Sequence, residues 1–194
     1  MGALVCFAEH VEQERRKIIS GLEKKLQDAF YFGEPESVVA LGREIHDWDP
    51  NNSYAYVGFA VRECLNRNYS EAIGYAGLAI EFNSSNREAL LMKLDLVQQF
   101  YDPFDACFSL DSVRHLLMQA FSAFPFDEDV LERSLIISIN ILDDVEEARR
   151  LYDFGSARNP SRFQKYRRNI VAAQAKRMRY RFDRTPCQAR RVNQ

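Results

Sequence analysis

The chain has 194 residues, of which 46% are hydrophobic and 28% charged, and its formal net charge is −2. These values are typical of globular proteins and exclude the disordered and fibrous classes. A chain of this length suits one domain and buries roughly 70% of its unfolded surface, enough to fold without disulfides or metals.

The cysteines and the hydropathy of the sequence indicate the cellular compartment of the protein. Four widely separated cysteines, with no C-x-x-C pair and no histidine at ligand spacing, are typical of a reducing cytoplasm and do not predict a metal site. The N-terminus lacks the basic region of a secretory signal, and no stretch reaches the roughly 20 apolar residues of a membrane helix. We therefore expect a cytoplasmic protein.

The charge is divided unevenly along the chain. Residues 161–194 contain eleven Lys/Arg and the single acid Asp183, which leaves a charge of about −12 on residues 1–160 and about +10 on the rest. Such a division indicates either a tail that meets an anionic partner or a tail that folds back on the acidic body.

Apolar residues recur at helical spacing from the start of the chain. One long amphipathic helix is expected over about 9–32, ended by Gly33, and a second helix follows Pro35 and stops before Asp49-Pro50. The next two expected helices form a hairpin over 53–86, with a polar turn at Asn66-Arg67-Asn68.

The pattern of this hairpin repeats at an interval of 34 residues. The same alternation of apolar and turn positions continues upstream and, after an extended loop near 101–110, resumes through a unit that ends at Pro160. A last helix is expected over about 162–182, with Phe163, Tyr166, Ile170 and Ala173 on its inner edge.

The hairpin resembles the tetratricopeptide repeat (TPR). The residues that carry the resemblance are Tyr56, Ala60, Tyr69, Ala72, Ala76, Ala79 and Ser84, and in the last unit Val145, Ala148, Tyr152, Gly155 and Pro160. The departures are Tyr56 for the usual Trp, Ala76 for an aromatic residue, Ser84 for Pro, and an insertion in the third unit.

This resemblance implies an all-α fold, a right-handed α-solenoid of about four antiparallel helix hairpins with a C-terminal capping helix. The implied arrangement is a single domain over 1–182, with repeats at about 19–52, 53–86, 87–127 and 128–160, the capping helix at 161–182, and a basic, disordered tail at 183–194.

In the family the first helices of the hairpins line a concave groove that binds segments of other proteins. The corresponding groove positions are Tyr54, Val57, Val61, Leu91, Met92, Asp95, Glu132 and Ile136. An apolar middle with acids near its ends would favour an apolar or amphipathic segment with basic groups. Alternatively, neighbouring helices or the tail cover this row as ordinary core. The Lys, Asn and Arg that some family members use to clamp the terminal carboxylate of heat-shock chaperones are absent here.

Enzymatic chemistry is not expected. The chain contains no P-loop, no G-x-G-x-x-G, no H-E-x-x-H and no G-x-S-x-G. His46-Asp47-Trp48-Asp49 places ligand types in a row, but successive side chains diverge around a helix end. We predict no catalytic residue, cofactor or metal.

The basic tail interleaves arginine with aromatic residues, as surfaces for single-stranded nucleic acid or anionic membranes do. Its basic residues are Lys176, Arg177, Arg179, Arg181, Arg184, Arg190 and Arg191. The simpler interpretation is a capping helix with a basic solvent face.

The sequence thus predicts a non-enzymatic protein-binding module, such as an adaptor or small chaperone, that holds a partner segment in the concave groove. The alternative is a structural subunit of a larger assembly whose tail contacts nucleic acid or an anionic membrane. The identity of the partner and the oligomeric state do not follow from the sequence.

Overall fold

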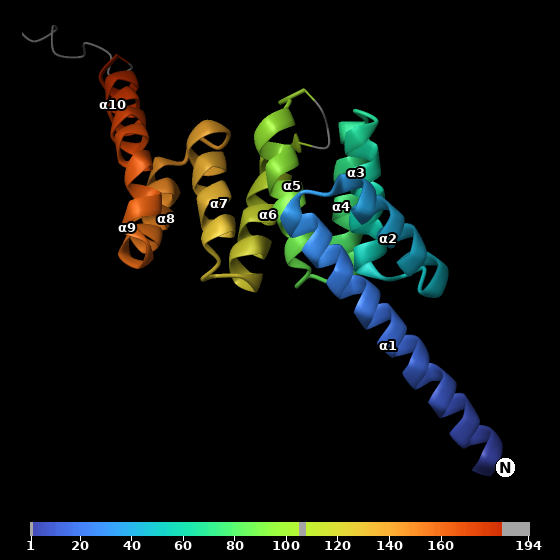
Figure 1. Ribbon diagram of the computed structural model, residues 1–194. Coiled ribbons are helices and arrows are strands. Elements are labelled where there is room, and N and C mark those ends of the chain that lie inside the picture. The colour runs from blue at the N-terminus through green and yellow to red at the C-terminus, as the bar shows by residue number, and fades with distance from the viewer. Residues whose placement is uncertain (1, 105–107, 184–194) are drawn as a thin grey trace, which may run out of the picture. The chain divides into compact units, whose positions relative to one another are not determined.

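The computed structural model describes residues 2–104 and 108–183, with side chains for 9–104 and 108–177. Within these ranges all regular secondary structure is helical, so the all-α prediction is confirmed (Figure 1). The chain divides into two compact units, residues 1–125 and 126–194. The division falls close to the boundary predicted between the third and fourth repeats.

The first unit consists of consecutive helices, each packed on the next one in sequence. They are α1 (Gly2–Phe32), α2 (Pro35–Trp48), α3 (Ser53–Leu65), α4 (Tyr69–Phe82), α5 (Arg87–Phe100) and α6 (Leu110–Ala123). Helix α1 begins earlier than the sequence predicts, and its N-terminal half extends beyond the other helices of this unit (Figure 1).

Local chemistry explains the helix ends. Gly33 adopts φ +70, a left-handed conformation that glycine reaches without steric cost, and α1 stops there. Pro35 then occupies the first turn of α2, where its missing N–H costs no hydrogen bond. The side chains of Asn52 and Asn86 cap α3 and α5 by accepting from the backbone N–H of Tyr54 and Ala89, respectively.

Small residues let the helices of the first unit approach closely. A Cβ built on Gly58 of α3 would lie 2.7 Å from the Cα of Gly42 in α2, so neither position accepts a side chain. Ala60 of α3 and Ala72 and Ala79 of α4, three of the residues that carry the family resemblance, are fully buried.

The second unit contains α7 (Glu128–Asn140), α8 (Val145–Arg158), α9 (Pro160–Phe163), a 3-10 turn η2 (Gln164–Tyr166) and α10 (Arg167–Asp183). The prediction of a single capping helix over 162–182 is therefore wrong in detail, because the 3-10 turn η2 separates α9 from α10. Phe163 is fully buried, and its ring fills the space beside Gly155, where an added Cβ would lie 2.5 Å from a ring atom.

Asparagine side chains at the helix starts also tie successive first helices together. The Asn86 side chain donates to Ser53 Oγ at 2.9 Å, and Asn159 donates to Glu128 in the same way, also at 2.9 Å. Asn52 and Asn86 stand 34 residues apart, so the spacing seen in the sequence reappears as a repeated hydrogen-bonding pattern.

Candidate functional site

The predicted groove residues differ in accessibility. Val57, Leu91 and Met92 are buried, with 0%, 4% and 7% of their surface exposed. Tyr54, Val61 and Asp95 in the first unit, and Glu132 and Ile136 in the second, are partly exposed. The apolar middle of the predicted row thus contributes to the core, and the accessible part of the first unit's row is largely polar.

Polar side chains from three helices converge beside Tyr54. The Asn52 side chain donates to Glu23 Oε1 at 2.7 Å, and the Gln27 amide donates to the Tyr54 hydroxyl. The charge of Glu88, at the start of α5, also acts on the Tyr54 hydroxyl. We call these five residues the Tyr54 cluster.

The Tyr54 cluster is a region of negative charge. Burial is the main cause that raises the pKa of the Tyr54 hydroxyl, and the charges of Glu88 and Glu23 raise it further, while the hydrogen bond from Gln27 acts in the opposite direction. Among the described residues, neither Glu23 nor Glu88 forms an ion pair with a basic side chain. Glu88 is only 9% exposed, and its Oε2 has no hydrogen-bond partner in the described part of the chain.

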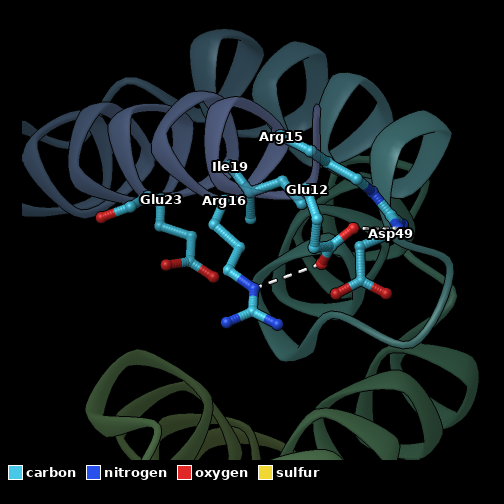
Figure 2. Close-up of a pocket in the computed structure, with 7 residues that line it drawn as sticks. Glu12, Arg15, Arg16, Ile19, Glu23 and Asp49 are labelled. Carbon is cyan, nitrogen blue, oxygen red and sulfur yellow. Dashed lines mark hydrogen bonds and ion pairs between the residues drawn. The ribbon is translucent and has the colours of Figure 1, made fainter. Parts of the chain in front are cut away.

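A hollow of about 290 Å³ lies along α1 next to this cluster and shares Glu23 with it (Figure 2). It is lined by Glu12, Arg15, Arg16, Ile19, Ser20, Glu23 and Asp49. The arginines are already engaged, since Arg16 Nε donates to Glu12 at 3.2 Å and Arg15 Nε donates to the Trp48 carbonyl at 3.1 Å. A hollow of this size suits one or two side chains of a partner.

In the second unit, Glu132 has a structural role. Its carboxylate accepts hydrogen bonds from Arg162, Lys165 and Tyr166 of the C-terminal segment. Burial favours the neutral acid, but these three donors outweigh it and lower the pKa of Glu132 to about 2. This predicted groove acid is therefore committed to contacts inside its own unit.

The predicted basic tail is only partly described. Lys176 is exposed, and Arg177 forms an ion pair with Glu146 of α8. The side chains of Arg179 and Arg181, and the residues Arg184, Arg190 and Arg191, lie outside the described part of the structure.

His46 does not take part in a polar site. Its ring packs against Phe59 with the ring centroids 5.2 Å apart, and Phe59 in turn contacts Tyr56 and Tyr75. Throughout the described ranges, no three His, Cys, Asp or Glu side chains are grouped as metal ligands. The side chains near His46 therefore form an aromatic surface.

Sequence reasoning placed Tyr54 on the groove face but missed Asn52 and Glu88. The only local signal at Glu88 is an acid in the first turn of a helix, which is commonly explained by the helix dipole. Its charge and that of Glu23, which lies 65 positions earlier, act on the same Tyr54 hydroxyl, and this depends on how α1, α3 and α5 pack.

No protein-family model, no curated protein and no solved structure matches this chain. None of the helices in the described ranges combines the length and the apolar character needed to cross a membrane.

Proposed function

We propose that the chain is a non-enzymatic protein-binding module of the TPR type, an adaptor or small chaperone, in which a face of the first unit holds a segment of a partner protein. The fold supports this proposal through its paired antiparallel helices, its small residues at the helix crossings and its asparagine caps 34 residues apart. A right-handed solenoid of about four hairpins is the arrangement we infer.

The observation that carries the proposal is the convergence of partly exposed polar side chains from α1 and α3, with Glu88 of α5 beneath them, beside a hollow. Binding sites for extended segments use a few such groups on a rigid helical scaffold. Val61 lies two turns from Tyr54 along α3 and extends the same face.

The side chains that remain accessible change the kind of partner segment that we expect. With Val57, Leu91 and Met92 buried, an apolar segment would find little apolar surface here. The groups that remain favour hydrogen bonding and positive charge. We therefore propose a partner segment that carries basic and polar side chains.

Photo-crosslinking in the native cell tests the location. A photoreactive amino acid at position 61 of the full chain should crosslink a discrete partner, while the same group at exposed Glu71 of α4 should not. Equal crosslinking at both positions, or none at position 61 when the partner still co-purifies, would contradict the proposed face.

A second candidate function, a structural subunit whose tail contacts an anionic surface, is supported by the charge division of about −12 and +10. On this alternative, removal of residues 184–194 would abolish binding to RNA or anionic vesicles at low salt and leave crosslinking at position 61 unaffected.

A further inference from the structure

The Tyr54 cluster contains two carboxylates whose charges act on one hydroxyl, that of Tyr54. Glu23 accepts a hydrogen bond from the neutral Asn52 side chain. Charged side chains that are largely buried are usually paired, because desolvation disfavours an isolated charge. Here Glu88 is nine-tenths buried, yet Oε2 lacks a partner among the described residues.

The neighbouring basic residues do not remove this negative charge. Arg15 and Arg16 line the adjacent hollow, but their side chains donate hydrogen bonds to the Trp48 carbonyl and to Glu12, respectively. In Figure 2 the Glu23 carboxylate and Glu12 lie on opposite sides of the Arg16 side chain. A cation from outside the chain would therefore meet a carboxylate at the rim and a second one deeper in the cluster.

We propose that the Tyr54 cluster binds the guanidinium group of an arginine in a partner peptide. This inference rests on the proposed function and names the anchor of the bound segment. Glu23 at the rim accepts from the guanidinium, and Glu88 supplies the second charge and its unpartnered oxygen.

Arginine fits better than lysine for a geometric reason. Its planar guanidinium carries five N–H donors and can serve two carboxylates and a hydroxyl at once, and it is less strongly hydrated than an ammonium group. Contact with Glu88 Oε2 requires a change of side-chain rotamer, which is common when interfaces form.

A titration followed by NMR tests the site without the natural partner. The full chain, labelled with ¹⁵N, is titrated with acetyl-Gly-Arg-Gly-amide and, in parallel, with the citrulline peptide of the same shape but no charge. We expect saturable shifts at the amides of Tyr54 and Glu88 with the arginine peptide only, and weaker binding at higher salt.

Variants then assign the binding to the two carboxylates. Glu88→Gln preserves the shape of the side chain and should weaken binding about tenfold or more, because the lost contact is a charged hydrogen bond. Glu23→Gln, at the partly exposed rim, tests the same site if Glu88→Gln fails to fold. Glu71→Gln on α4 is the matched control and should bind the peptide as the natural chain does.

Several outcomes would overturn the assignment. Equal shifts with the citrulline peptide, unchanged binding in Glu23→Gln, or equal binding of a lysine peptide would each contradict it. Shifts that appear only after removal of residues 184–194 would make the chain's own tail the occupant instead of a partner. If the arginine peptide binds but no partner is crosslinked at position 61, the cation site is retained and the proposed function is refuted. If a partner is crosslinked at position 61 but the arginine peptide does not bind, the proposed function is retained and the cation site is refuted.

Discussion

The close contact between α2 and α3 at Gly42 and Gly58 makes a sharp test of the fold. We expect Gly58→Ala to destabilise the protein, because the new Cβ would lie 2.7 Å from the Gly42 Cα and 3.0 Å from the Val38 carbonyl oxygen. Both are backbone atoms. They can give way only if α2 and α3 move apart as a whole.

Two opposing terms set the size of the effect. Forcing a methyl group into a packed site costs about 1–3 kcal/mol, and contacts with backbone favour the upper end. Alanine is better than glycine in a helix by up to about 1 kcal/mol, which offsets part of this cost. At Gly74 of α4 an added Cβ meets nothing within 4 Å, so Gly74→Ala should show the gain alone. The two variants should thus differ by about 2–3 kcal/mol.

Urea unfolding followed by tryptophan fluorescence measures this difference. Trp48 is the only tryptophan and lies at the end of α2, so its signal reports on the unit that contains the crossing. The midpoint should fall for Gly58→Ala and rise for Gly74→Ala with an unchanged slope. Equal midpoints for the two variants would refute the close crossing of α2 and α3.

Two further predictions concern the caps and the second unit. Asn86→Ala should lower the free energy of unfolding by about 2–3 kcal/mol, because it removes both the cap of α5 and the hydrogen bond to Ser53. The control Asn83→Ala, at an exposed position, should lower it by less than about 1 kcal/mol. Equal urea midpoints for the two variants would contradict this prediction. Because the pKa of Glu132 is lowered to about 2 when folded, its contribution is present above its ordinary pKa and is lost as pH falls from about 4.5 to 2. Glu132→Gln should flatten the fall in helical circular dichroism over that interval, and an identical acid profile would show that Glu132 does not anchor the C-terminal segment.

The features predictable from sequence are those set by local chemistry. Gly33 and Pro35 mark the junction of α1 and α2 because each has a backbone preference that neighbours cannot override. The buried alanines of α3 and α4 were predictable as well, since small residues at helical spacing have few uses other than close packing. Helical periodicity shows that a face is apolar.

Periodicity does not show what covers that face. Val57 lies on the row assigned to the groove and is fully buried. In stacked hairpins the first helices contact neighbours on more than one side, so the boundary between core and groove depends on how the helices pack. A single sequence contains no record of that packing. Part of the apolar row assigned to the groove therefore lies in the core.

The break between α9 and α10 has a similar cause. Residues 161–185 contain neither glycine nor proline, so a continuous helix was the natural expectation. In the structure Phe163 fills the space beside Gly155, while Arg162, Lys165 and Tyr166 all bind Glu132. We attribute the 3-10 turn to these contacts, because short 3-10 segments commonly serve as connectors where tertiary contacts constrain the chain.

Two glutamates in the first halves of α5 and α7 show how equal side chains come to differ in role. Glu132 accepts from three donors inside its own unit, so its charge is fully explained by the fold. Glu88 is only 9% exposed, and its Oε2 has no hydrogen-bond partner in the described part of the chain. Stability alone would favour an uncharged residue there, because a buried charge without a cationic partner is unfavourable. Under the proposal above, an arginine of a partner peptide would supply that cation.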